Sequence, residues 1–151
     1  GDPVIVGKIV YAGTNSGRLA AIDITSGMRV WTKKEGAIGP VWIENNALFV
    51  LTDQQKLKRL DRKNGAEVWS YDLPVYKNPK RSTGKYGHFS PVLAGNKLYV
   101  AGTDKKIRVF DPKTGELLNS IPVRGGAASQ LAIANERMYI LSGSGKLIAF
   151  Q

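Results

Sequence analysis

Hydrophobic and polar residues alternate along this chain in short stretches that are separated by turn-forming residues. Between residues 39 and 72 this pattern predicts four strands, over residues 39–44, 47–52, 56–61 and 66–72. The pair Asn45-Asn46 separates the first two, and asparagine tolerates the positive φ of a tight hairpin. No stretch shows a convincing helical period, so the sequence predicts an all-β protein.

The four-strand pattern recurs along the chain in a constant register. An aromatic residue of the second strand recurs at Tyr11, Phe49, Tyr99 and Tyr139, with spacings of 38, 50 and 40 residues. Four-stranded units of about 40 residues are typical of the blades of a β-propeller. We therefore expect about four antiparallel blades in this chain. Three blades are expected over residues 1–36, 37–73 and 90–124, and an incomplete fourth blade over residues 125–151. A basic loop at residues 74–89 separates the second blade from the third.

A second marker is an Asp-x-x-x-Gly turn between the third and fourth strands, with a Trp four residues after the Gly. The marker residues are Asp23, Gly27 and Trp31, then Asp61, Gly65 and Trp69, then Asp111 and Gly115 with Asn119 in place of the Trp. The Asp side chain can hold the backbone amides of the turn, and the Gly can take the left-handed conformation. Because these residues are periodic, we interpret the aspartates as turn residues and the tryptophans as packing residues.

The stretch from Ala21 to Gly27 with Trp31 resembles the PQQ-type propeller repeat, in which the Trp docks between adjacent blades. Three further segments, at residues 1–6, 90–95 and 144–151, resemble the BamB family. The members of this family are propeller lipoproteins of the outer-membrane barrel assembly machinery. Members usually have eight blades, so the resemblance implies that the chain is the C-terminal half of such a propeller.

The resemblance also implies a function. It implies a non-catalytic, protein-binding scaffold without a cofactor, located in the periplasm at the outer membrane of a Gram-negative bacterium. The parent protein is expected to be a lipoprotein whose partners are the barrel insertase complex and client β-strands. The open edges of a half-propeller further predict that the chain pairs with another half-propeller.

The charge of the chain favours an anionic partner, because 22 Lys and Arg oppose 12 Asp and Glu for a net charge of +10. Strand order assigns much of this charge to the face with the second-to-third loops and the blade connections. The cations expected there are Lys33, Lys34, Lys56, Lys77, Lys80, Arg81, Lys85, Lys105, Lys106, Arg124 and Lys146, against the acids Glu35, Asp53 and Asp104. A protein patch, a lipid surface and nucleic acid are all chemically suitable partners.

The basic loop is the best candidate contact site, because long loops on rigid scaffolds tend to carry function. The predicted partner-binding residues are Lys77, Lys80, Arg81, Lys85, Tyr86, His88, Lys105 and Lys106. The alternative is a solvated, disordered insertion without a binding role.

No motif for catalysis or metal binding is present in the sequence. The chain has no Cys and one His, too few for a zinc cluster of Cys and His ligands. The single His lies in no recognisable Ser-His-Asp pattern, and a lone His is more often structural than catalytic. Two alternatives stay open besides the scaffold. One is a fragment of a PQQ-dependent dehydrogenase or another PQQ-like propeller, and the other is a non-specific binder of nucleic acid or anionic surfaces.

Overall fold

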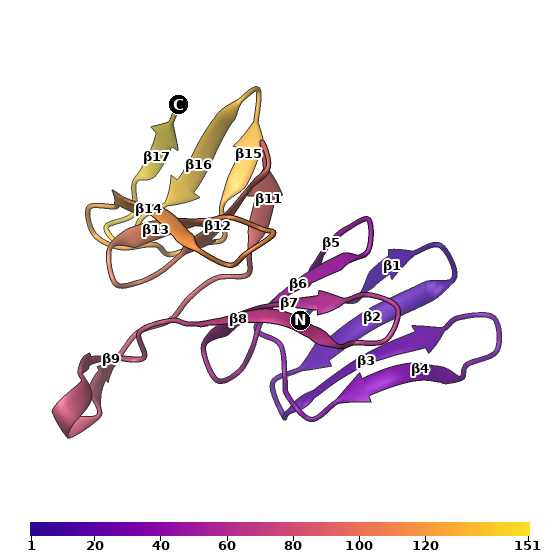
Figure 1. Cartoon of the computed structure of the whole chain (residues 1–151). Helices are drawn as coiled ribbons and strands as arrows, with labels where there is room; N and C mark the ends of the chain where they lie inside the picture. Colours follow the sequence, from indigo (N-terminus) through magenta and orange to yellow (C-terminus); the bar gives the residue numbers. More distant parts are fainter. The chain divides into compact units, whose positions relative to one another are not determined.

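The computed structural model describes all 151 residues and confirms the all-β prediction. The chain divides into two units, Gly1–Asp72 and Leu73–Gln151, and each is described by itself (Figure 1). The single helix, the 3₁₀ turn η1 (Pro79–Arg81), has three residues. None of the helical structure is therefore long and apolar enough to cross a membrane.

The first unit contains two four-stranded antiparallel sheets in which the strands follow chain order. The first sheet consists of β1 (Val4–Val6), β2 (Ile9–Thr14), β3 (Arg18–Asp23) and β4 (Arg29–Lys33). The second sheet consists of β5 (Trp42–Glu44), β6 (Ala47–Leu51), β7 (Lys56–Asp61) and β8 (Glu67–Asp72). Both sheets have the order expected of a propeller blade.

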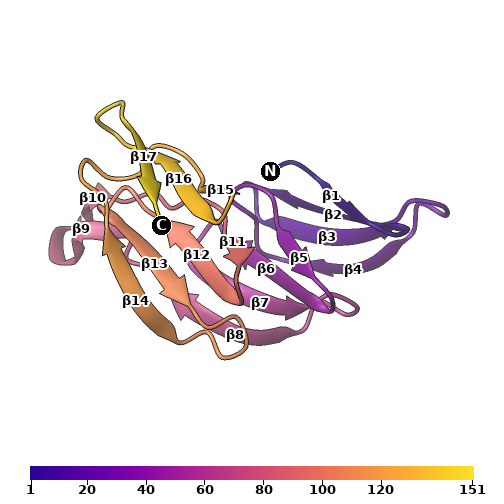
Figure 2. The ribbon, with the colours of Figure 1, turned by 90° about the horizontal axis from the view of Figure 1, so that it is seen from above.

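The second unit contains one four-stranded sheet, one three-stranded sheet and a small hairpin (Figures 1 and 2). The four-stranded sheet consists of β11 (Val92–Ala94), β12 (Lys97–Ala101), β13 (Lys106–Phe110) and β14 (Leu117–Pro122). The three-stranded sheet consists of β15 (Ala132–Ala134), β16 (Arg137–Leu141) and β17 (Leu147–Phe150). The hairpin consists of β9 (Tyr76–Asn78), η1 and β10 (Thr83–Lys85).

Each of the four large sheets falls within one range predicted for a blade, although the blade boundaries themselves stay a prediction. The strand expected over residues 39–44 begins only at Trp42. Gly39 has a φ of 73° and Pro40 has no amide hydrogen, so neither residue continues a ladder. β17 lies at the edge of its sheet, and the expected pairing with another half-propeller stays a prediction.

The first two strands of each of the four large sheets are joined by a two-residue turn. The pairs Val6–Ile9, Glu44–Ala47, Ala94–Lys97 and Ala134–Arg137 close these four hairpins. In the turn Gly95-Asn96 both residues have positive φ, 55° and 59°. A turn of this kind matches the twist of the flanking strands, which explains why Gly and Asn recur at these positions.

The Asp-x-x-x-Gly turns have the same hydrogen bonds in three sheets. Asp23 Oδ1 accepts hydrogen bonds from the Thr25 and Ser26 amides, and the Gly27 amide donates to the Asp23 carbonyl at 2.8 Å. The corresponding aspartates, Asp61 and Asp111, accept from the amides two residues later, and Gly65 and Gly115 have φ values of 74° and 76°. The amide hydrogen bonds hold the pKa of Asp23 below its usual value, as expected for a carboxylate that stabilises a turn.

Trp31 docks on the Asp61–Gly65 turn of the neighbouring sheet in the first unit. Its indole Nε1 donates to the Arg62 carbonyl at 2.8 Å, and its ring lies 6.2 Å from that of Tyr11. A Cβ added to Gly65 would stand 2.8 Å from the ring carbons Cδ2 and Cε3. The Trp31 indole thus links the two sheets of this unit, and the absence of a side chain at Gly65 leaves room for its ring.

In each four-stranded sheet the Trp position of the repeat pairs with a residue of the third strand. Ala21 pairs with Trp31, Arg59 with Trp69 and Val109 with Asn119, and a register shift follows each pair. Asn119 therefore occupies the position of a docking Trp in the second unit. Trp69 packs within its own sheet against Phe49, with ring centroids 6.2 Å apart.

The core of the first unit contains a charged group that is almost out of solvent. Lys58 Nζ lies 2.7 Å from Glu35 Oε2 and 2.8 Å from Glu67 Oε1. Burial disfavours the charged ammonium, but the hydrogen bonds and charges of the two glutamates raise the pKa of Lys58 above its usual value. The three side chains link β7 and β8 to the segment that precedes β5.

Replacing Lys58 with Met is expected to lower the free energy of unfolding by about 3 kcal/mol, because it leaves the buried Glu35 carboxylate without its cation. Lys56 provides the control on the same strand. Its ammonium is 3.8 Å from Asp72 and its side chain is 40% exposed, against 13% for Lys58. Lys56→Met should cost less than about 1 kcal/mol. Equal effects in urea denaturation would show that Lys58 has no special role.

Candidate functional site

The basic loop folds into a β-hairpin, which the sequence did not predict. Asn78 pairs with Thr83 and Tyr76 with Lys85, and η1 closes the tip. Ser82 ends η1 in the left-handed conformation and donates its amide to the Pro79 carbonyl. At Gly84 the φ is 71°, and an added Cβ would stand 2.9 Å from the Lys77 Cβ, so glycine lets the two strands approach closely.

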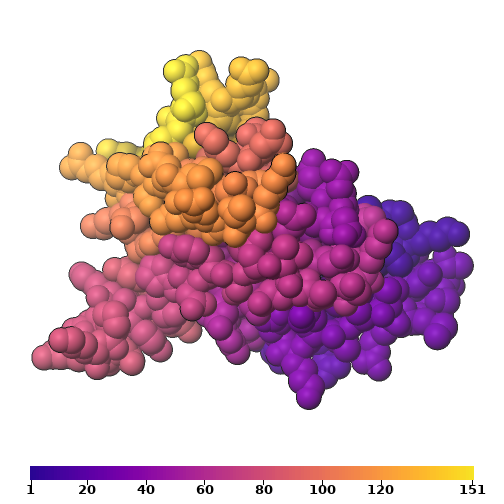
Figure 3. Space-filling view, viewed as in Figure 1, coloured from indigo at the N-terminus to yellow at the C-terminus, as the bar shows by residue number.

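The hairpin presents cations without any acidic residue. Lys77, Lys80, Arg81 and Lys85 are all exposed, and residues 74–89 contain no Asp or Glu. In Figure 3 the hairpin forms a protrusion at the lower left. The second unit as a whole has twelve Lys and Arg against four Asp and Glu, so it carries +8 of the net charge of +10. The charge is thus concentrated in the unit that contains the hairpin.

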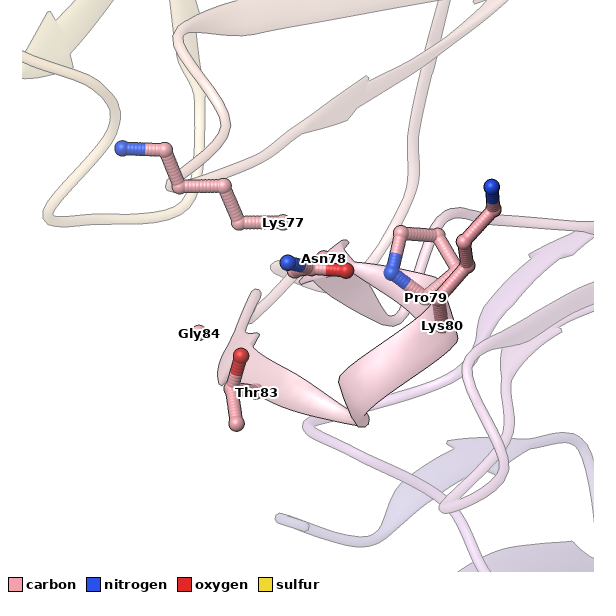
Figure 4. Close-up of a pocket in the computed structure, with 6 residues that line it drawn as sticks. All are labelled: Lys77, Asn78, Pro79, Lys80, Thr83 and Gly84. Atoms are coloured by element: carbon pink, nitrogen blue, oxygen red, sulfur yellow. The ribbon is translucent and has the colours of Figure 1, made fainter.

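Two shallow hollows adjoin the hairpin and share Lys77. The larger, about 500 Å³, is lined by Lys77, Asn78, Pro79, Lys80, Thr83 and Gly84. Figure 4 shows the ammonium groups of Lys77 and Lys80 pointing away from each other. The smaller, about 300 Å³, brings Lys77, Tyr86 and Lys105 together with Thr103 and Asp104. Three predicted site residues from two segments therefore meet at one place.

Backbone hydrogen bonds attach the base of the hairpin to the sheet that follows it. The Tyr86 amide donates to the Val75 carbonyl, which closes the hairpin. The Gly87 amide donates to Thr103 Oγ1 at 2.9 Å, and the Thr103 amide donates back to the Gly87 carbonyl. Lys105 and Lys106 are exposed in the connection that contains Thr103 and at the start of β13. These hydrogen bonds fix the hairpin and the segment with Lys105 and Lys106 in position relative to each other.

His88 does not belong to the contact surface, which corrects the sequence-based grouping. Only 3% of the His88 surface is exposed, and its backbone forms a β-bridge with Gly102. An added Cβ on Gly102 would stand 2.8 Å from the His88 ring, so the glycine makes room for it. A side chain this deeply buried cannot contact a binding partner, so the role of His88 is structural.

His88 lies next to a buried ion pair between Arg108 and Asp104. Arg108 Nη2 donates to Asp104 Oδ2 at 2.6 Å, and Arg108 Nη1 lies 3.4 Å from His88 Nε2. Since arginine can only donate, this contact requires an unprotonated Nε2. Burial, aided by the Arg108 charge and opposed by Asp104, lowers the pKa of His88 to about 4. His88 is therefore neutral at pH 7.

Sequence reasoning missed the pairing of Asp104 with Arg108. One signal was available, because Arg108 holds the same strand position as Lys58, 50 residues earlier. In both sheets an inward-facing cation on the third strand is paired with an acid from a connecting segment, Glu35 or Asp104. The prediction that Asp104 lies on the charged surface was therefore wrong, because its side chain is only 5% exposed and is paired with Arg108.

Comparison with known proteins identifies the family. A family model described as outer membrane protein assembly factor BamB matches residues 1–71 and 77–151. The chain belongs to the BamB family. The match leaves out residues 72–76, at the entry to the hairpin, and covers the four large sheets except the last residue of β8.

Individual relatives agree with this assignment. The outer membrane protein assembly factor BamB of Shewanella oneidensis is 27% identical over 96% of this chain and 35% of that protein. The crystal structure of BamB from Moraxella catarrhalis matches 95% of this chain and 46% of that chain, with a TM-score of 0.75 and 26% identity. The chain thus spans about a third of the length of the curated relatives it matches.

The propeller fold is also found in enzymes. The quinohemoprotein alcohol dehydrogenase of Comamonas testosteroni matches 91% of this chain and 28% of that chain, with a TM-score of 0.74. Its identity of 17% shows a common fold and nothing more about chemistry. The PQQ-like repeat inferred from Asp23, Gly27 and Trp31 and the β-propeller fold are thus confirmed by the family and its structures.

Proposed function

We propose that this chain is part of a non-catalytic scaffold that binds proteins during the assembly of outer-membrane β-barrels. The observation that carries the proposal is the BamB family match across both units. The parent protein would work in the periplasm of a Gram-negative bacterium, anchored at the outer membrane as a lipoprotein. Its partners would be the barrel insertase complex and client β-strands, and it would need no cofactor.

The first test is an affinity purification of the full-length parent protein from its own cell envelope, followed by mass spectrometry. We expect an outer-membrane barrel insertase and its associated lipoproteins among the recovered proteins. Recovery of none of them would contradict the scaffold proposal. Adding PQQ and Ca²⁺ while recording tryptophan fluorescence would then test the dehydrogenase alternative.

Within this scaffold the basic hairpin is proposed as a contact for an acidic protein surface. Its four exposed cations, together with Tyr86, Lys105 and Lys106, are held on a hydrogen-bonded base. An electrostatic contact of this kind accelerates association and fixes orientation, and it weakens as salt rises. The combination of concentrated charge and a defined base supports the hairpin over the other loops.

A variant with Lys77, Lys80, Arg81 and Lys85 all changed to Gln should fold normally and bind the purified insertase complex about tenfold more weakly at physiological salt. The matched control changes four other exposed lysines to Gln, namely Lys8, Lys63, Lys97 and Lys113. Both variants lose four charges, so a difference between them reports position rather than net charge. Surface plasmon resonance measures both affinities, and equal values would refute the role of the hairpin.

A further inference from the structure

The smaller hollow beside the basic hairpin is lined by two lysines that have no acidic partner. It measures about 300 Å³ and is lined by Lys77 of the hairpin, by Tyr86 at its base, and by Thr103, Asp104 and Lys105 of the β12–β13 connection. Lys77 and Lys105 are both exposed, and neither forms an ion pair within the chain. Two unpaired cations from different segments therefore share one small space.

The one acidic residue of this hollow does not neutralise its cations. Asp104 Oδ2 accepts a hydrogen bond from Arg108 Nη2 at 2.6 Å, and only 5% of the Asp104 side chain is exposed. Its charge is therefore balanced from the buried side by Arg108. The hollow keeps a net positive charge, which favours an anionic group of a ligand.

The backbone conformation of Lys105 is a second observation. In all four large sheets the connection between the second and third strands has a residue with positive φ, namely 89° at Gly17, 59° at Gln55, 66° at Lys105 and 80° at Gly145. Glycine adopts this conformation at the least cost. Gln55 is only 6% exposed, so packing accounts for its side chain, whereas Lys105 is exposed. A side chain kept in a disfavoured conformation without a packing reason points to a functional one.

The backbone that carries the walls of the hollow is fixed by hydrogen bonds. The Lys105 carbonyl accepts from the Val123 amide at 2.9 Å, and Thr103 exchanges two hydrogen bonds with Gly87. When a ligand binds, only the flexible ends of Lys77 and Lys105 have to be ordered. A site prepared in this way loses less entropy on binding than a mobile loop does.

We propose that this hollow binds the carboxylate of an acidic side chain from a partner polypeptide, with Lys77 and Lys105 as its two cationic contacts. Tyr86 and Thr103 line the same space, and their hydroxyl groups are able to donate hydrogen bonds to this carboxylate. This role of the hollow rests on the proposed contact between the hairpin and an acidic protein surface. It adds which group of the partner is held and which residues hold it.

The test is an NMR titration of the protein at about 20 mM salt with a peptide of Glu residues blocked at both ends. The matching Gln peptide is the uncharged control, and inorganic phosphate is titrated in parallel. We expect saturable amide shifts centred on Lys77, Tyr86, Thr103 and Lys105 with a Kd on the order of 1 mM, and none with the Gln peptide. Shifts spread over all exposed lysines, or phosphate binding as tightly at the same residues, would overturn the assignment.

A pair of variants separates a shared site from diffuse attraction. Lys77→Gln and Lys105→Gln should each weaken binding of the Glu peptide about threefold, and the double variant hardly further, since both lysines hold the same carboxylate. Independent losses would multiply to about ninefold and would refute a shared site. Lys113→Gln removes an exposed lysine outside the hollow and should leave the affinity nearly unchanged.

A Lys105→Gly variant tests Lys105 with two readouts that move in opposite directions. Glycine suits a φ of 66°, so the urea midpoint of unfolding should rise, while binding of the Glu peptide should fall as it does for Lys105→Gln. Unchanged peptide binding by this variant would refute the role of Lys105. The titration uses a peptide and not the insertase complex, so a failure here is distinguishable from a failure of the affinity purification that tests the scaffold.

Discussion

Replacing Trp31 with Ala is expected to lower the free energy of unfolding of the first unit by about 3–5 kcal/mol. The indole is buried between two sheets, contacts Tyr11 and donates a hydrogen bond to the Arg62 carbonyl. Its removal leaves both a cavity and a carbonyl without its donor. Urea denaturation followed by circular dichroism measures the loss.

Alanine substitutions at two glycines separate docking from backbone strain. Gly27 and Gly65 occupy the same turn position with φ values of 72° and 74°, so either substitution incurs the left-handed penalty of about 1–2 kcal/mol. Only at Gly65 does the new Cβ meet the Trp31 ring, at 2.8 Å, whereas nothing lies within 4 Å of it at Gly27. Gly65→Ala should therefore cost about 1–3 kcal/mol more than Gly27→Ala. Equal costs would contradict the docking of Trp31 on this turn.

The stability of the second unit is expected to fall as the pH drops from 7 to 5, and His88 is the cause. In the folded state the pKa of His88 is about 4, against about 6.5 when unfolded. Well above pH 6.5 the His88 side chain is neutral in both the folded and the unfolded state. Between about pH 6.5 and 4 the unfolded state takes up a proton that the folded state refuses, so stability is lost. The expected loss by pH 5 is about 2 kcal/mol.

The assignment to one residue is unusually direct, because the chain contains a single His and no Cys. Denaturation at pH 7, 6 and 5 measures the slope in a range where few other groups titrate. His88→Gln keeps a polar side chain of similar size and should remove most of the pH dependence. A slope that survives this substitution would show that the buried His88 is not its source.

The repeat explains how much of the fold was accessible from the sequence. The spacing of Tyr11, Phe49, Tyr99 and Tyr139 and the recurring Asp-x-x-x-Gly turn place all four sheets, because turn chemistry and strand alternation are local properties. The late start of β5 at Trp42 was missed, although Gly39 and Pro40 were visible signals. The hairpin at 76–85 was missed because its residues show little apolar alternation.

The candidate site was only partly visible in the sequence. Lys77, Lys80, Arg81 and Lys85 could be found as an uninterrupted cationic segment, and the structure places them all in solvent. His88 and Asp104 were assigned to the same surface because sequence order indicates which loop a residue belongs to but not which way its side chain points. Both turned out to be buried beside Arg108.

The sequence by itself determined the all-β repeat, the turn residues and the position of a cationic insertion, since each depends on neighbours along the chain. Only the tertiary structure decided which charges are buried in pairs and that Trp31 rests on Gly65. Trp31 reaches a turn of another sheet, and even Asp104 and Arg108, which are close in sequence, meet only because their side chains turn inward. Such contacts arise from packing, which a linear pattern of residue types does not encode.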